Sequence, residues 1–161
     1  MSRYYTVEFT GVTLDENYDA FEIRPAANKP CTVHAIYLGT EQTVAYDADA
    51  MARVRIIRLP ATATSGSGGA TPTPTRLDRM SAVAGFGADT NNPSTTNATT
   101  TGTAVNLHSW AFNNGDEWAF IPLPDMRPRV ENPEILVVRI LNPGVLVAAS
   151  GTIYIEESDR G

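Results

Sequence analysis

Residues 60–104 read PATATSGSGGATPTPTRLDRMSAVAGFGADTNNPSTTNATTTGTA, and they separate two groups of short apolar runs. The stretch consists mostly of Thr, Ala, Gly, Ser, Pro and Asn, with few large apolar side chains. A connection of this length without regular structure is uncommon inside a compact domain, and such connections are usually functional or disordered. We therefore expect a long polar loop between the two halves of a regular fold.

The sequence on both sides of this stretch alternates between apolar and polar residues, which is typical of half-buried β-strands. Turn residues such as Gly, Pro and Asn separate the runs, and none of the runs has the period of an amphipathic helix. Residues 41–51 are mixed in character and are expected to form a loop with one helical turn. The predicted strands span residues 4–9, 19–24, 31–38, 52–59, 105–112, 117–121, 135–141 and 149–156.

Short strands at this spacing favour an all-β fold, an antiparallel two-sheet sandwich. Eight strands in two sheets is the jelly-roll number, and the long polar loop lies between the fourth and fifth strands. Because a sequence defines strand number better than strand order, a sandwich of another topology remains open. The length of 161 residues suits one domain, so we expect a single jelly-roll-like domain over residues 1–161 with an extended loop at 60–104.

Two of the predicted strands carry additional signals. The apolar doublet Ile56-Ile57 interrupts the alternation of its strand, which predicts a β-bulge. The run ILVVRIL at 135–141 is almost continuously apolar. We therefore expect this strand to be covered on both faces, either within the chain or by a neighbouring subunit.

Asn114-Gly115 lies between two strand-like runs and predicts a tight β-hairpin turn, because both residue types tolerate positive φ. Such a hairpin would bring the aromatic residues of the two runs together. The simplest interpretation of these residues is that they form core or cross-strand pairs. They are Trp110, Phe112, Trp118 and Phe120.

Charge and cysteine content exclude several classes of protein. The formal net charge is −6 and Lys29 is the only lysine, so no basic surface for nucleic acid is expected. The single Cys31 excludes an intrachain disulfide and a multi-cysteine zinc site, and its apolar surroundings predict a small buried side chain. The N-terminal residues show no signal-peptide pattern, and no apolar run approaches the roughly 18 residues of a membrane span. We expect a protein that is made in a cytoplasm and has no membrane partner.

Few residues suggest catalysis. His34 and His108 are the only histidines, and each lies in a predicted strand, where a hydrogen-bonded structural histidine is the simplest interpretation. No G-x-S-x-G motif accompanies them, so a hydrolase triad has little support. We predict no catalytic residue and no enzymatic activity.

Other polar motifs also have simple interpretations. Asp47 and Asp49 could share a calcium ion, but few further oxygen ligands lie nearby in the sequence, which favours a solvated acid pair. The GSGG motif at 66–69 lacks the lysine of a phosphate-binding loop, which favours a flexible spacer. The acidic run at 156–159 is expected to be a solvated end. No metal-binding or cofactor-binding residue is therefore predicted.

The middle of the long stretch contains apolar and basic residues in polar surroundings. These residues could attach the loop to its own sandwich, or they could dock on another chain, because ordering a loop costs entropy that some contact must offset. Both alternatives remain open. The candidate assembly contacts are Arg76, Leu77, Arg79, Met80, Val83 and Phe86.

The order of several segments resembles a group of jelly-roll structural proteins from the virions of tailed bacteriophages. The segments are DAFEIRPAANKPCTVHAIYLGT (19–40), RVRIIRLPATATSGSGGATPTPTRLD (53–78), AVNLHSWAFN (104–113), ILVVRIL (135–141) and SGTIYIEE (150–157). The resemblance implies a non-enzymatic virion structural protein and favours a capsid decoration (cement) protein. It transfers no functional residue, because no residue-level motif defines the contacts of the group.

A protein of this kind would form a symmetric homo-oligomer, with a trimer expected, on the surface of a phage head. Its partners would be other copies of itself and the major capsid protein, with no cofactor, nucleic acid or membrane. The alternative is a carbohydrate-binding jelly-roll module, for example in a tail or head fibre, that uses exposed aromatic residues. The residues that could form such a platform are Trp110, Trp118 and Phe120.

Overall fold

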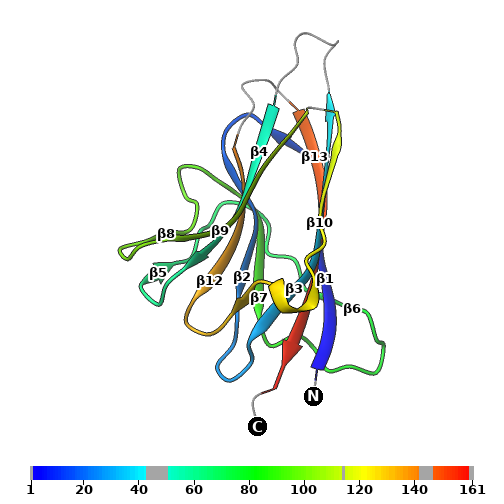
Figure 1. The fold of residues 1–161 in the computed structure, drawn as a ribbon, viewed down its shortest axis with the longest axis vertical. Helices are drawn as coiled ribbons and strands as arrows, with labels where there is room; N and C mark the ends of the chain where they lie inside the picture. The colour runs from blue at the N-terminus through cyan, green and yellow to red at the C-terminus, as the bar shows by residue number, and fades with distance from the viewer. Residues whose placement is uncertain (1, 43–50, 114, 142–146, 160–161) are drawn as a thin grey trace.

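The computed structural model describes residues 2–42, 51–113, 115–141 and 147–159, and it shows two antiparallel sheets packed face to face (Figure 1). Sheet A has the order β10 (Glu117–Phe120), β3 (Cys31–Gln42), β13 (Val147–Ser158), β1 (Ser2–Leu14) and β6 (Thr75–Arg76), and β11 (Arg129–Val130) also pairs with β3. Sheet B has the order β7 (Gly87–Pro93), β2 (Tyr18–Arg24), β12 (Ile135–Leu141), β4 (Met51–Leu59) and β9 (Val105–Asn113). A separate pair consists of β5 (Ala63–Thr64) and β8 (Thr99–Thr100), and η1 (Pro124–Met126) is a single 3₁₀ turn.

The eight predicted strands pair in a nested pattern. The first pairs with the last (β1 with β13), then β2 with β12, β3 with β10, and β4 with β9. This nesting is the pairing expected when one long antiparallel hairpin is folded into a jelly roll. The predicted all-β, two-sheet antiparallel sandwich is confirmed. The two chain ends lie at the same end of the sandwich, because β1 starts there and its antiparallel partner β13 ends there (Figure 1).

The core lies between the two sheets and is built from alternate residues of each strand, as the period-2 pattern predicts. Phe9 of β1 and Phe21 of β2 meet across the sandwich, with ring centroids 5.2 Å apart. The largest fully buried apolar side chains are Tyr5, Phe21, Ile23, Ile36, Ile56, Leu136, Ile140, Ile153 and Ile155. Cys31 is also buried, as predicted.

Strand β12 is covered on both faces by residues of its own chain. Leu136, Val138 and Ile140 belong to the main core between the sheets. Ile135 and Val137 face the other way, into a second apolar cluster that contains Ala98 and the partly buried Ala63. Both alanines come from residues 60–104, so the long stretch covers the outer face of β12 and no neighbouring subunit is needed there.

A bulge lies beside the Ile56-Ile57 doublet, but it is in β9 and not in β4 as predicted. The register between β4 and β9 shifts between Ile56, which pairs with His108, and Ile57, which pairs with Asn106. Ile56 belongs to the main core, whereas Ile57 belongs to the second cluster on the outer face. Consecutive strand residues face opposite sides, so the doublet is regular in β4, and the extra residue is Leu107 of β9.

The predicted β-hairpin around Asn114-Gly115 is wrong, because β9 and β10 do not pair with each other, although a turn joins them. The Asp116 amide donates to the Asn113 carbonyl at 3.1 Å, and Gly115 has φ +91°; Asn114 lies outside the described residues. However, β9 pairs with β4 in sheet B, and β10 pairs with β3 in sheet A. The turn carries the chain from one sheet to the other, because turn chemistry fixes the local backbone and leaves the choice of strand partner to the core.

Residues 60–104 do not form one structureless loop. They contain β7, a seven-residue strand at the edge of sheet B, together with the short strands β5, β6 and β8. The sequence of β7, GADTNNP, lacks the large apolar residues by which strands are recognised, yet Ala88 to Asn92 are buried. The expected helical turn near residue 45 falls on residues 43–50, outside the described residues.

We predict that Gly115→Ala lowers the free energy of unfolding by about 1–2 kcal/mol, because a Cβ is unfavourable at positive φ. Gly39→Ala is the matched control, since an added Cβ there would meet no heavy atom within 4 Å and Gly39 lies in a strand. Chemical denaturation of both variants measures the difference. Equal stability of the two variants would show that residue 115 is free to leave its positive φ.

Candidate interaction surface

Three buried carboxylates attach residues 60–104 to the sandwich. Asp19 and Glu22 project from β2, and Glu157 projects from β13; their exposed fractions are 0%, 0% and 1%. Each accepts hydrogen bonds from backbone amides of the long stretch. Because a buried carboxylate needs several donors, each forms an anchor that holds the stretch at a fixed place.

Glu22 is the centre of the first anchor. Its Oε2 accepts hydrogen bonds from the Gly66 amide at 2.9 Å and from Asn92 Nδ2 at 3.1 Å. Its Oε1 accepts from Arg24 Nη1 at 2.8 Å and from the Ser65 hydroxyl. Strand alternation puts Glu22 on the face opposite Phe21 and Ile23, which is the outer side of sheet B, and residues 65–66 cover its carboxylate there.

The GSGG motif at 66–69 is part of this anchor and is not the flexible spacer that its composition suggests. Besides the Gly66 contact, the Gly69 amide donates to Asn92 Oδ1 at 3.1 Å. A Cβ at Gly69 would lie 2.0 Å from the Thr90 carbonyl oxygen, so only glycine allows the two backbones to approach this closely. Ala70 and Thr90 then exchange two backbone hydrogen bonds.

Asp19 forms the second anchor with Arg139, the one charged residue of β12. Arg139 Nε and Nη2 donate to the two Asp19 oxygens at 2.5 and 3.1 Å, and the Ala98 amide donates to Oδ2 at 2.8 Å. Arg139 Nη2 also donates to the Ala98 carbonyl at 3.1 Å. Burial raises the pKa of Asp19 above its ordinary value, although the Arg139 hydrogen bonds and charge act in the opposite direction.

Glu157 forms the third anchor, and its position corrects the prediction of a solvated acidic end at 156–159. Its Oε2 accepts from the Gly85 amide at 2.7 Å and the Phe86 amide at 3.0 Å. Lys29 Nζ lies 3.7 Å and Arg3 Nη1 3.9 Å from its Oε1. The two cations offset the cost of burying this carboxylate between the ends of β1 and β3.

Arg24 adds a further contact to β7. Its guanidinium pairs with both oxygens of Asp89 as well as with Glu22. Burial raises the pKa of Asp89, but the Arg24 hydrogen bonds and charge outweigh burial, so the net pKa lies below the ordinary value. Polar strand β7 is therefore stabilised by ionic contacts where other strands use apolar packing.

Between the anchors the chain crosses the open edge of sheet A. Arg76 pairs with Tyr5 of β1, and the Leu77 amide donates to the Tyr4 carbonyl at 3.0 Å. The Tyr5 hydroxyl donates to the Ala82 carbonyl at 2.9 Å. These bonds fix both ends of residues 77–83, which we call the arm tip.

The structure places the predicted contact residues in two different environments. Leu77, Met80 and Val83 project from the arm tip, with exposed fractions of 56%, 88% and 65%. Phe86, in contrast, is only 4% exposed and packs edge-on against Tyr5 in the main core, so it is not a surface contact. The long stretch therefore does both things considered from its sequence: it packs on its own sandwich and it leaves an apolar tip exposed.

The two predicted basic contacts frame the arm tip. Arg76 is exposed and its Nη1 donates to the Ser81 carbonyl at 2.7 Å, which closes the tip on itself. The Asp78 carboxylate accepts a bond from the Met80 amide at 2.9 Å, and Arg79 is exposed. The tip thus presents apolar side chains beside two guanidinium groups.

Beside the arm tip, the outer face of sheet A has a groove of about 280 Å³. A bulge in β3 next to His34 places His34 and Ala35 together on this face. His34 Nε2 lies 2.7 Å from Glu156 Oε2, which confirms that His34 is a hydrogen-bonded strand histidine. The groove is lined by Tyr4, His34, Ala35, Tyr37, Leu77, Tyr154 and Ile155.

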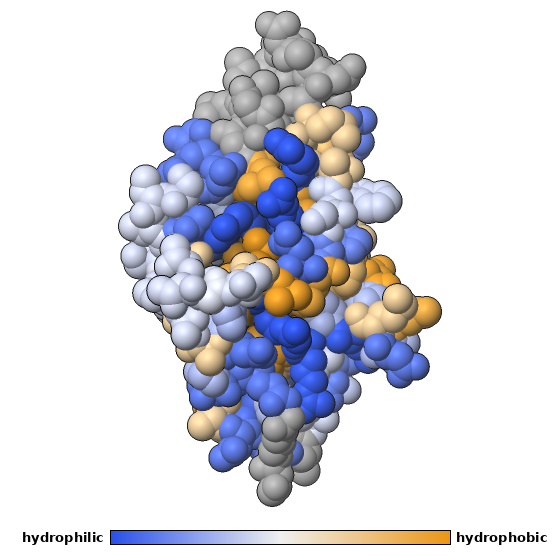
Figure 2. All heavy atoms as spheres, turned by 60° about the vertical axis from the view of Figure 1, so that its left-hand side comes forward, coloured by the Kyte–Doolittle hydropathy of each residue, from blue (hydrophilic) through white to orange (hydrophobic). Residues whose placement is uncertain are grey.

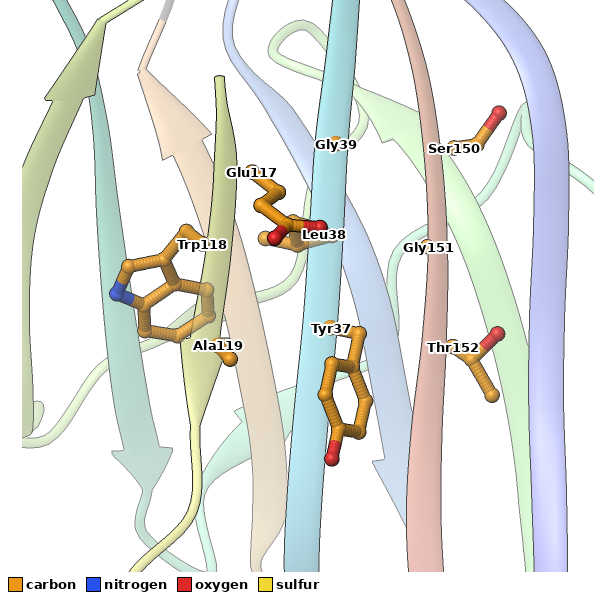
Figure 3. A pocket seen from close by; sticks show the side chains of 9 residues that line it. All are labelled: Tyr37, Leu38, Gly39, Glu117, Trp118, Ala119, Ser150, Gly151 and Thr152. Atoms are coloured by element: carbon orange, nitrogen blue, oxygen red, sulfur yellow. The ribbon is translucent and has the colours of Figure 1, made fainter.

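A second hollow, of about 290 Å³, adjoins this groove and shares Tyr37 with it (Figure 3). The surface is hollowed here because two of the lining residues, Gly39 and Ala119, have little or no side chain. Figure 3 shows the Tyr37 ring, the Glu117 carboxylate and the hydroxyls of Ser150 and Thr152 around it. Aromatic rings, a carboxylate and hydroxyls therefore lie together along the outer face of sheet A.

The aromatic residues of β9 and β10 lie at the side of the sandwich away from β6 and β7. Trp118 is 5% exposed, so the predicted platform of Trp110, Trp118 and Phe120 is not available as a flat surface. His108 lies between them, with its ring 4.7 Å from Phe120 and 6.0 Å from Trp118. Trp110 is 58% exposed and is the one tryptophan that a ligand could reach.

The chain after β10 exposes further apolar side chains. Ile121, Leu123 and Met126 are 65%, 69% and 71% exposed, and we call them the β10 patch. On the neighbouring edge of sheet B, Val105 and Leu107 of β9 are also exposed. Figure 2 views the molecule from the side of β5, β8 and β9 and shows apolar patches between hydrophilic side chains.

The described residues offer little that catalysis or metal binding would need. No group of three or more His, Cys, Asp or Glu side chains there could hold a metal ion, and Asp47 and Asp49 lie outside the described residues. Burial raises the pKa of the Cys31 thiol, which makes this cysteine a poor nucleophile. In the described parts of the chain, no helix has the length and apolar character needed to cross a membrane.

Comparison of the chain with protein-family models, with curated proteins and with solved structures finds no match. Three surface features expose apolar or aromatic side chains that another molecule could contact: the arm tip, the tyrosine-lined groove and the β10 patch.

We predict that Glu22→Gln lowers the free energy of unfolding by about 3–5 kcal/mol, because the amide places a donor against donors in a buried site. Glu134→Gln is the control, since Glu134 is half-buried and lies 3.8 Å from Arg58. The control should cost less than about 1 kcal/mol. Urea denaturation measures both, and equal costs would show that the Glu22 anchor is not an essential part of the fold.

Proposed function

We propose that this protein is a non-enzymatic structural component of a bacteriophage virion. Its most specific form is a capsid decoration (cement) protein that forms a symmetric homo-oligomer on the head and contacts the major capsid protein. The observation that carries the proposal is the arm tip: an ordered segment that exposes Leu77, Met80 and Val83 to solvent. The resemblance of the sequence to phage jelly-roll proteins points in the same direction.

The energetics of the arm tip support a contact role. Ordering a loop costs conformational entropy, and here buried carboxylates on either side meet that cost. The tip itself gains little from its own chain, because its large side chains remain in water. Fully burying each of them against a partner would contribute about 1.5–3 kcal/mol. Repetition of such a contact around a symmetric assembly increases the avidity without any new interaction.

The test is a triple variant, Leu77→Ser, Met80→Ser and Val83→Ser, compared with Phe86→Ala. The triple variant should keep the stability of the isolated chain to within about 1 kcal/mol and lose co-sedimentation with the cognate capsid. Phe86→Ala should instead cost about 3–5 kcal/mol of stability, because it leaves a cavity beside Tyr5.

Two results would contradict the proposal. One is full capsid binding by the triple variant. The other is an electron-microscopy map of the native assembly in which this chain contacts no capsid protein. The stability measurement on the same samples separates a lost contact from a lost fold.

A second candidate function is carbohydrate binding, and the tyrosine-lined groove with its adjoining hollow favours it. Tyr4 and Tyr37 are 43% and 44% exposed, and the Glu117 carboxylate and the Thr152 hydroxyl lie nearby. Aromatic faces and a few polar groups in a shallow groove suit the apolar and hydroxyl-bearing faces of a sugar.

If this second function holds, glycan-array binding by the isolated chain should fall at least about tenfold in Tyr37→Ala, a loss of about 1.4 kcal/mol. Trp110→Ala is the control, since Trp110 is exposed on β9 and lies outside the groove. Absence of binding to any glycan by the unmodified chain, or equal losses in both variants, would remove this alternative.

A further inference from the structure

The edge strands of the two sheets are covered on one side of the sandwich and uncovered on the other. On one side the chain covers its own edges: β6 pairs with β1 in sheet A, and Ala70 pairs with Thr90 of β7 in sheet B. On the other side β9 and β10 are the outermost strands of their sheets, and no described residue pairs with their free edges. An edge that is left open beside exposed apolar side chains is a place where another chain can bind.

We propose that the arm tip of one copy docks on the β10 patch of the next copy, which links the copies head to tail. The inference rests on the proposed function, because it names the partner of the arm tip as a second copy of this chain. The surfaces involved are Leu77, Met80 and Val83 on one copy and Ile121, Leu123 and Met126 on the other.

The two surfaces are complementary in charge as well as in apolar character. The arm tip is framed by Arg76 and Arg79, both exposed. In the segment that carries the β10 patch, Asp125 lies between Leu123 and Met126 and is exposed, whereas Arg127, the next basic residue, is half-buried. Opposite charges around an apolar centre set the orientation of two partners and reject the alternative pairing of like surfaces.

The position of the two surfaces defines the kind of assembly. The arm tip follows β6, and the patch follows β10; these strands occupy opposite ends of sheet A. A contact between two different surfaces on opposite sides is heterologous, and it closes into a ring when the rotation between copies allows it. A trimer, the expected oligomer, is the smallest such ring.

The local backbone explains why the contact uses side chains and not strand pairing. Pro122 and Pro124 flank Leu123, and η1 follows at once. Prolines lack the amide that a pairing strand requires, so they prevent a second chain from extending sheet A beyond this point. They also hold the apolar side chains in place, which lowers the entropy lost on docking.

Variants with one added cysteine test the contact in the full chain. The native Cys31 can stay, because it is buried and should not react. Met80→Cys and Leu123→Cys chains are co-expressed and treated with a short bismaleimide. Cross-linked dimers should form from the co-expressed pair and not from either variant alone. The double variant should give a ladder that ends at the closed ring, with three chains expected.

The controls separate the possible failures. Co-expression of Met80→Cys with Thr99→Cys provides an exposed cysteine on β8, away from both surfaces, and should give at least about tenfold less dimer. Analytical ultracentrifugation of the unmodified chain, free and after release from capsids, reports its oligomeric state independently.

The inference is overturned if the chain is oligomeric but the Met80–Leu123 pair cross-links no better than the control pair. It is also overturned if Met80→Cys cross-links with itself, which would indicate a two-fold contact between arm tips. A chain that binds capsids as a monomer would likewise exclude the ring while leaving the decoration role intact. A chain that neither oligomerises nor binds capsids would remove the proposed function itself.

Discussion

Hydrogen bonds from backbone amides to three buried carboxylates are the interaction on which the rest of this structure depends. Asp19 accepts from the Ala98 amide, and Glu22 accepts from the Gly66 amide. Glu157 accepts from the amides of Gly85 and Phe86. A carboxylate that is removed from water must be satisfied by several donors, and here a polar segment of the same chain supplies them. The anchors convert a stretch that is too poor in apolar residues to fold alone into an ordered part of the domain.

These anchors decide which surfaces the sandwich exposes. Held by Asp19 and Glu22, the chain at the β5–β8 pair supplies Ala63 of β5 and Ala98, just before β8, to the cluster that covers the outer face of β12. Held by Glu157, the chain can cross sheet A through β6 and return as β7. The same connection therefore closes the edges on one side of the molecule and projects the arm tip, whereas no described residue pairs with the outer edges of β9 and β10 on the other side. The asymmetry is what a head-to-tail assembly requires.

The sequence was informative where burial is apolar and misleading where it is polar. Alternation located the eight strands, because it follows from apolar packing, whereas the Ile56-Ile57 doublet reflects a strand buried on both faces and not a bulge in β4. Strand β7 was missed because its buried positions are Asp89, Thr90, Asn91 and Asn92. The sequence also left open whether Phe86 packs on its own sandwich or on another chain, because its polar neighbours hide a strand that begins at the next residue. Strand partners, as in the failed hairpin, are long-range choices that no local pattern contains.

One residue could have revealed the anchors. Arg139 is the only charge in the apolar run of β12, and a strand covered on both faces must pair such a charge with an acid. The acid had to come from a neighbouring strand, and Asp19 directly opposes Arg139 in the register between β2 and β12. From there the argument extends to the long stretch, because an outer face that holds a buried ion pair must have a cover. Its Thr, Asn and Gly content then has a physical meaning, since small polar residues approach a carboxylate closely and donate to it. A composition that suggests a flexible tether is also the composition of a segment built to cover buried charge.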